Sequence, residues 1–170
     1  MIKAIVYESN AGHTKHYAEL LSGETGLQAC ELKNAGKVLS KGDEVIFMGW
    51  LMAGSVKGFG KAAGKYAVKA VCTVGMANPS EKFAEETVNR YKIKDAKVFY
   101  LKGGYDINKL HGIYRIMMNT MAKNVTASIE KKAEKTPEDL ASLDLFKNGG
   151  DYVCKENLAD VVKWYNSVKS

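Results

Sequence analysis

Five apolar runs, each bounded by turn-forming residues, are spread through the first hundred residues of the chain. They span residues 2–7, 27–32, 43–49, 68–75 and 96–101. The first, third and fourth runs are rich in β-branched and aromatic residues and show little polar alternation, which is typical of strands covered on both faces. The pattern therefore predicts five strands, three of them buried in the centre of a sheet.

Stretches with helical periodicity accompany these strands. Apolar residues recur three and four positions apart in 14–22, 80–91, 109–133 and 155–168. In the longest stretch the apolar stripe consists of Ile113, Ile116, Met117 and Met121. Residues 136–152 contain a proline, an acidic pair and two adjacent glycines, which predicts a surface connection. The alternation of strand and helix predicts a doubly wound α/β fold, with a parallel sheet and helices on both of its faces.

The length and composition of the chain predict one globular domain over residues 1–170. The chain has 25 Lys and Arg against 19 Asp and Glu, a formal net charge of +6, and 46% of it is hydrophobic. A chain of about 150 residues buries roughly 70% of its extended surface on folding, so neither a disulfide nor a structural metal is needed for stability. The positive charge is mild and spread along the chain, which allows an acidic partner or an anionic surface and requires neither. We expect no nucleic-acid partner.

Cysteine and histidine spacing argues against a disulfide framework and a metal centre. The three cysteines are Cys30, Cys72 and Cys154, and no two of them form a CxxC pair. None of the three histidines has a metal-ligand spacing with a carboxylate. The apolar stretch at the amino terminus is too short for a signal peptide and for the ~20 residues of a membrane span. We therefore expect a reducing, cytoplasmic setting and no bound metal.

A turn with hydroxyl side chains and a glycine follows the first predicted strand and leads into the first predicted helix. It consists of Ser9, Asn10, Ala11, Gly12, His13 and Thr14. Ligands of open parallel sheets bind beyond the carboxyl ends of the strands, and a helix that begins there points unpaired N–H groups outward, which suits a phosphate. Gly12 allows a close backbone approach, and a protonated His13 would be favourable beside a phosphate. An ordinary capped helix start without any ligand fits the same residues.

The spacing Y-x-S-x-x-G-x-T-x-x-x-A, from Tyr7 to Ala18, resembles the phosphate loop of the flavodoxin family, whose members bind flavin mononucleotide (FMN). Where the family pattern usually has a further hydroxyl, this chain has Ala11. The resemblance implies a flavodoxin-like fold with five strands in the order 2-1-3-4-5. It also implies that the turn binds FMN noncovalently and that the protein acts in electron transfer.

The resemblance places two further loops beside the flavin ring. After the third strand come Trp50, Leu51, Met52, Ala53 and Gly54, and after the fourth come Gly75, Met76, Ala77 and Asn78. The resemblance implies that Trp50 stacks on the ring and that Gly54 eases a backbone change that presents a carbonyl to flavin N5–H. The second loop lacks the family's usual aromatic residue, so Met76, backbone amides or a substrate would cover that side of the ring. The alternative for the first loop is that its apolar residues cap the core.

A glycine-containing segment followed by a basic, methionine-rich helix, within residues 102–118, is similar to the menaquinone-dependent protoporphyrinogen oxidases of the same fold. This similarity implies a redox partner protein or a small quinone-like substrate. The helix also fits peripheral contact with a membrane, but a sheet-covering helix with solvated lysines is the favoured interpretation. The alternatives to an electron carrier are an FMN-dependent oxidoreductase acting on a quinone or porphyrinogen, and a cofactor-free interaction domain. No residue is assigned as a catalytic acid or base.

Overall fold

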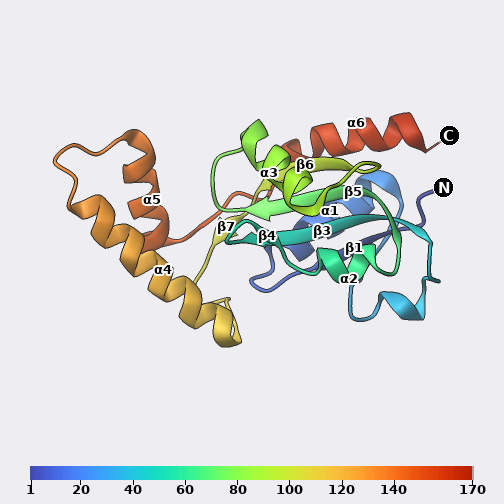
Figure 1. Ribbon diagram of the computed structural model, residues 1–170, viewed down its shortest axis with the longest axis horizontal. Helices are drawn as coiled ribbons and strands as arrows, with labels where there is room; N and C mark the ends of the chain where they lie inside the picture. The colour runs from blue at the N-terminus through green and yellow to red at the C-terminus, as the bar shows by residue number, and fades with distance from the viewer. Residues whose placement is uncertain (170) are drawn as a thin grey trace.

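Five parallel strands form the centre of the protein in a computed structural model that describes residues 1–169 (Figure 1). The strands are β1 (Ala4–Glu8), β2 (Gln28–Glu31), β3 (Glu44–Met52), β5 (Ala67–Gly75) and β6 (Lys97–Lys102). They are arranged in the order β2-β1-β3-β5-β6. The predicted α/β class with a parallel sheet is confirmed.

Three short strands change the predicted strand count and numbering. β4 (Ser55–Val56) pairs antiparallel with the end of β3, so the main sheet has six strands and is only mostly parallel. β7 (Gly104–Tyr105) and β8 (Gly150–Asp151) form a separate antiparallel pair. The prediction of five strands in the order 2-1-3-4-5 therefore differs from the structure. These strands were missed because two-residue segments have no measurable apolar period.

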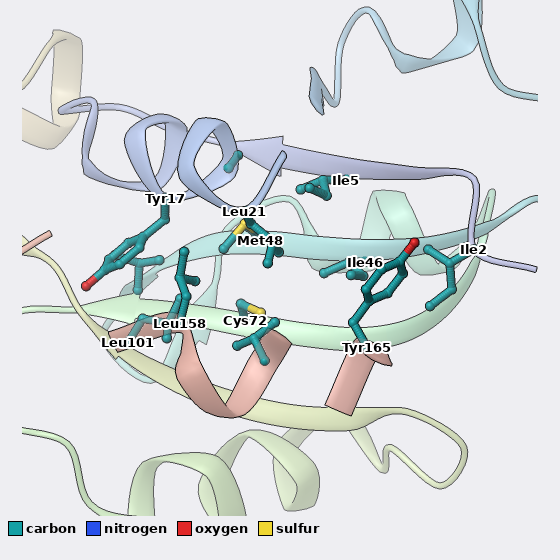
Figure 2. Close-up of a cluster of buried hydrophobic side chains, with 14 residues drawn as sticks. Ile2, Ile5, Tyr17, Leu21, Ile46, Met48, Cys72, Leu101, Leu158 and Tyr165 are labelled. Carbon is teal, nitrogen blue, oxygen red and sulfur yellow. The ribbon is translucent and has the colours of Figure 1, made fainter. Parts of the chain in front are cut away.

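Helices cover both faces of the sheet. α1 (His13–Thr25) and α6 (Ala159–Val168), which follows the 3₁₀ turn η2 (Glu156–Leu158), pack on one face. α2 (Phe59–Ala63), α3 (Glu81–Tyr91) and the 3₁₀ turn η1 (Ala35–Lys37) contribute side chains to the other face. Figure 2 shows Tyr17 and Leu21 of α1 and Leu158 of η2 directed toward the strands that they cover.

The surroundings of β3 explain why its sequence does not alternate between apolar and polar residues. Successive side chains of a strand point to opposite faces of the sheet. Ile46 and Met48 pack in the core beneath α1 and α6, whereas Val45 and Phe47 pack in the core beneath α2, and all four are fully buried. A strand with helices on both sides has no solvent face, so every position favours an apolar residue.

Residues 104–151, called the arm below, extend from the carboxyl ends of the strands. The arm begins at β7, ends at β8, and carries α4 (Gly112–Glu130) and α5 (Pro137–Asn148), which lie beside the sheet rather than over it (Figure 1). The prediction of a surface connection over 136–152 is wrong, because α5 occupies most of it. No helix among the described residues is both long enough and apolar enough to cross a membrane.

The apolar stripe predicted for the longest helix is exposed in the structure. Its members have relative exposures of 66% for Ile113, 69% for Ile116, 46% for Met117 and 36% for Met121. α4 instead buries Met118, Ala122 and Ile129, of which Met118 and Ala122 pack in a cluster with Tyr105, Leu110 and Leu145. The prediction that this helix covers the sheet is therefore wrong, because α4 packs on α5 and on the base of the arm.

Candidate functional site

A cavity of about 280 Å³ lies at the carboxyl ends of β1, β3 and β5, beneath α4 of the arm. Its volume is close to the lower end of the range of about 300–1,000 Å³ that is usual for small-molecule sites. The predicted residues that line it are Ser9, Asn10, Ala11, His13, Thr14, Trp50, Leu51, Met52, Ala53, Gly75 and Met76. The structure thus brings all three predicted segments to one cavity. Gly12, Gly54, Ala77 and Asn78 are not among its lining residues.

Hydrogen-bond donors gather at the end of the cavity formed by the turn between β1 and α1. Gly12 precedes α1 with a φ of 98°, a left-handed conformation that favours glycine. Within residues 1–169 the N–H groups of Gly12, His13 and Thr14 donate to no acceptor, whereas the N–H of Lys15 donates to the Ser9 hydroxyl at 3.3 Å. These free N–H groups at the positive end of a helix suit an anion.

Thr14 supplies a second sign that this end of the cavity is built for a ligand. Its side chain is only 1% exposed and lines the cavity. Its hydroxyl makes no hydrogen bond to another group in the described part of the chain, and it is not one of the buried side-chain atoms left without a partner there, so it can be reached from the cavity. The hydroxyl is therefore available to donate a hydrogen bond to a ligand oxygen in the cavity.

Asn10 and Ala11 connect the turn to the arm. The Asn10 side-chain oxygen accepts a hydrogen bond of 3.0 Å from the N–H of His111, the residue before α4. Ala11 packs against the apolar cluster of the arm that includes Tyr105 and Leu110. The resemblance assigned both residues to the cofactor, and in the structure each also holds the arm against the site.

His13 is buried between the turn and the base of the arm. It is 8% exposed, and its Nε2 atom lies 3.9 Å from a carboxylate oxygen of Asp151 in β8. Burial lowers the pKa of His13 below its usual 6.5, and this effect outweighs the opposing attraction of Asp151. The imidazole is therefore mainly neutral at pH 7, so the expected cation beside a phosphate is not present in the ligand-free protein at that pH.

Acidification is expected to destabilise the fold through His13. Because its pKa is lower in the folded than in the unfolded chain, the unfolded chain binds more protons as the pH falls below about 6.5. The stabilising contribution is complete well above pH 6.5 and is lost as the pH falls from there through the lowered pKa of the folded chain, with a slope of at most about 1.4 kcal/mol per pH unit. Urea unfolding of His13→Gln from pH 7.5 to 5 should show a shallower loss than the wild type. His16→Gln, which removes an exposed histidine from the same helix, should keep the wild-type profile.

The segment after the third strand is a β-hairpin rather than the predicted loop. β3 continues through Met52, and a two-residue turn of Ala53 (φ 47°) and Gly54 (φ 72°) leads into β4. Trp50 meets the ring of Tyr114 in α4 edge-on, with the ring centroids 4.9 Å apart. Trp50 therefore joins the hairpin to the arm, and it also lines the cavity.

The loop after β5 contributes only its first part to the cavity. Gly75 and Met76 line it, but Ala77 and Asn78 are exposed and held elsewhere. The Tyr100 hydroxyl donates to the Ala77 carbonyl at 3.0 Å, and burial raises the pKa of Tyr100 to about 12, so this donor stays protonated. The Lys102 ammonium donates to the Asn78 side chain at 2.8 Å.

The arm supplies the cavity residues that sequence reasoning missed. Together with Val74 of β5 they are Gly104, Tyr105, Asp106, Leu110, Met117, Met118 and Met121. One signal was present, because two glycines follow the last strand of the sheet. A Cβ on Gly104 would lie 2.7 Å from His13 Nε2, so a glycine is needed where the arm approaches the turn. The methionine-rich helix was noticed in the sequence, but its side chains were not placed in the site.

The cavity is polar beside the turn and mostly apolar along the rest of its walls, and Asp106 is the one carboxylate among the described residues that line it. Free N–H groups and the Thr14 hydroxyl lie at the turn, while the side chains of the hairpin, Met76 and α4 are apolar. No group of His, Cys, Asp and Glu residues able to hold a metal ion is found among residues 1–169. No protein-family model matches the chain, and a search of curated proteins finds no match.

Proposed function

We propose that this chain is a flavodoxin-like protein that binds FMN noncovalently in the cavity and acts in electron transfer. The observation that carries the proposal is a single cavity with unpaired donors at one end and apolar walls along the rest. FMN is divided in the same way, because it has an anionic phosphate at one end and a flat aromatic ring at the other. The order β2-β1-β3-β5-β6 supports the proposal, because the chain reverses direction across the sheet between β1 and β3, where open α/β sheets bind ligands.

The residues at the two ends of the cavity fit the two ends of FMN. The N–H groups of Gly12, His13 and Thr14, with the hydroxyls of Ser9 and Thr14, would hold the phosphate. Trp50 and Met76 would pack on the ring, since both line the apolar part of the cavity. When bound, the flavin supplies the ability to accept and release electrons, and the protein orients it and limits its contact with water.

An oxidoreductase acting on a small quinone-like substrate is a second candidate. The observation in its favour is that Met117 and Met121 line the cavity and are also partly exposed, so a flat apolar molecule could reach the cavity from solvent. Reduction of a soluble quinone by the FMN-loaded chain at a catalytic rate would favour this candidate over an electron carrier. Three cysteines without a disulfide support our proposal of a reducing, cytoplasmic setting.

Replacement of Thr14 with valine tests the proposed phosphate site. Valine keeps the shape of the side chain and removes the hydroxyl, and a hydrogen bond to a charged group contributes about 1.5–3 kcal/mol. Titration followed by flavin fluorescence should give an FMN affinity about tenfold or more below that of the wild type. Riboflavin, which lacks the phosphate, should bind Thr14→Val and the wild type alike, and it should bind the wild type more weakly than FMN does.

Two results would contradict the proposal. The first is a wild-type chain that takes up neither FMN nor riboflavin, which would favour a cofactor-free interaction domain of the same fold. The second is an equal loss of FMN and riboflavin affinity in Thr14→Val, which would mean that the turn does not hold the phosphate.

A further inference from the structure

The exposed face of α4 is continuous with the cavity. Met117 and Met121 belong to both, since they line the cavity and have relative exposures of 46% and 36%. Ile113 and Ile116, with relative exposures of 66% and 69%, extend this apolar surface away from the cavity mouth. Contiguous apolar residues on a surface are typical of binding sites, whereas single ones are ordinary.

Basic side chains from three segments lie close to residues that line the cavity or to their immediate neighbours. The Lys57 ammonium, after β4, lies 5.0 Å from the centre of the Tyr114 ring of α4. Arg90 of α3 reaches the hairpin, where its guanidinium is 3.3 Å from the Ser55 hydroxyl. Lys109, just before α4, is exposed and lies 3.7 Å from Asp106. Lys109 is thus paired with Asp106, whereas neither Lys57 nor Arg90 has a carboxylate within 4.0 Å in the described chain, so these two cations are not neutralised by an ion pair.

We propose that the apolar face of α4 and the basic residues near the cavity form a docking surface for an acidic protein. The partner would place an apolar centre on Ile113 and Ile116 and its carboxylates opposite Lys57, Arg90 and Lys109. This inference rests on the proposed function, because an electron carrier must bring its partner close to the cofactor. The charge complementarity favours rapid association, and the apolar contact prolongs it.

The placement of the charges favours a protein over a membrane surface. A helix that lies on a membrane carries its cations along the borders of its own apolar face. α4 has two basic residues, Arg115 and Lys123. Lys123 is seven residues after Ile116 and so lies about 20° around the helix from it, at one border of the apolar face. Arg115 lies about 200° from Ile113, so only one border carries a cation. The basic residues near the cavity come instead from three segments, which suits a compact partner that reaches the cavity.

Cytochrome c, a haem protein, is used in two charge states to probe the proposed docking surface. Native cytochrome c is cationic, and succinylated cytochrome c carries carboxylates in place of its lysine ammonium groups. Equilibrium binding of each is measured at low salt by calorimetry, with both the FMN-loaded and the FMN-free chain. Hydrogen exchange then maps the protected segments. We expect the succinylated form to bind and to protect α4 and the β3–β4 hairpin, and the native form not to bind.

Matched variants separate docking from general charge attraction. Lys57→Glu/Arg90→Glu should lower the affinity for succinylated cytochrome c about tenfold or more. Lys94→Glu/Lys97→Glu makes the same change of net charge at the other end of the strands, near the start of β6. This variant should lower the affinity for succinylated cytochrome c less than about threefold. Ile113→Ser/Ile116→Ser should also weaken binding about tenfold, with an unchanged circular dichroism spectrum because both side chains are exposed.

Three outcomes would overturn the docking proposal. They are equal losses in the two charge-reversal variants, protection outside α4 and the hairpin, and binding to vesicles with anionic lipid without any binding to succinylated cytochrome c. Failure of the proposed function is a separate result. A chain that takes up no FMN but binds succinylated cytochrome c on α4 would refute the cofactor and support the docking surface.

Discussion

The Ser9→Asp variant is expected to lose about 100-fold or more in FMN affinity, while its melting temperature stays at or above that of the wild type. The Ser9 hydroxyl accepts the N–H of Lys15 in the first turn of α1, and a carboxylate at this position can accept the same bond. A negative charge at the positive end of a helix stabilises the helix. The same charge repels the phosphate that the free N–H groups of the turn would hold. Fold stability and cofactor affinity should therefore change in opposite directions.

The measurement compares FMN with riboflavin for the wild type, Ser9→Asp and the uncharged Ser9→Asn. Only FMN with Ser9→Asp combines a charged ligand with a charged side chain, so only this pair should show the large loss of affinity. Riboflavin affinity should stay within about threefold across the three proteins, because riboflavin has no phosphate to repel. A Ser9→Asp protein that keeps its FMN affinity would place the phosphate away from this turn. If the melting temperature of Ser9→Asp fell as far as that of a core variant, its loss of FMN affinity would reflect unfolding as well as repulsion. The FMN and riboflavin affinities of the uncharged Ser9→Asn would then test the proposed phosphate site.

The turn was predictable from the sequence because it is contiguous along the chain. Its donors are backbone N–H groups, and their position depends only on where a strand ends and the next helix begins. β1 ends at Glu8 and α1 begins at His13, so the expected anion site follows from local structure. The buried strands were predictable for a similar reason, because a strand between two helical layers is apolar at every position.

The hairpin was not predictable in the same way. β3 continues past Gly49, its last residue paired with β1. Trp50 pairs there with β5 and contacts Tyr114 edge-on, and Met52 pairs with β4. Tyr114 is 64 residues further along the chain, as the two residue numbers show. An apolar stretch between glycines has the same pattern whether it forms a loop or a hairpin tip.

α4 was misread because the helix carries two apolar stripes. One contains Ile113 and Ile116, and the other contains Met118, Ala122 and Ile129. Periodicity identifies apolar faces but does not say which one is covered, and the more hydrophobic stripe is the exposed one. The covered stripe needs α5, which sequence reasoning assigned to a loop.

α5 was missed although its start has a clear helix signal. The Thr136 side chain accepts from the N–H of Asp139, the Asp139 carboxylate accepts from the N–H of Thr136, and Pro137 occupies the first helical position. This is a capping box followed by a proline that suits a helix start. A proline beside an acidic pair is also typical of a turn, so the sequence pattern alone does not separate a helix start from a turn here.

Leu145→Ala is expected to release the arm while the central sheet stays folded. Leu145 is 8% exposed and belongs to the small cluster that joins α4, α5 and the base of the arm. Truncation of a buried leucine to alanine is destabilising by about 2–5 kcal/mol. The cluster contains only five buried residues, whereas the core beneath α1 and α6 contains fourteen, so the loss falls on a unit with little other support.

Hydrogen exchange distinguishes the two units. In Leu145→Ala, the amides of α4 and α5 should lose most of their protection, and those of β1, β3 and β5 should keep theirs. In Leu158→Ala, a matched change at a fully buried residue of the main core, protection should fall in the sheet and the arm alike. Equal loss of protection in sheet and arm in Leu145→Ala would show that the arm is not an independent unit.

Leu145→Ala also tests whether the arm contributes to FMN binding. Leu145 does not line the cavity, but Met117, Met118 and Met121 of α4 do, so a released arm removes one wall without substitution of any residue that lines the cavity. FMN affinity should therefore fall about tenfold in Leu145→Ala, and riboflavin affinity should fall to the same extent, because the lost wall is apolar. Ser9→Asp affects only the phosphate-bearing ligand, whereas Leu145→Ala affects both. The two variants thus assign the anionic end of the ligand to the turn and its flat end to the arm.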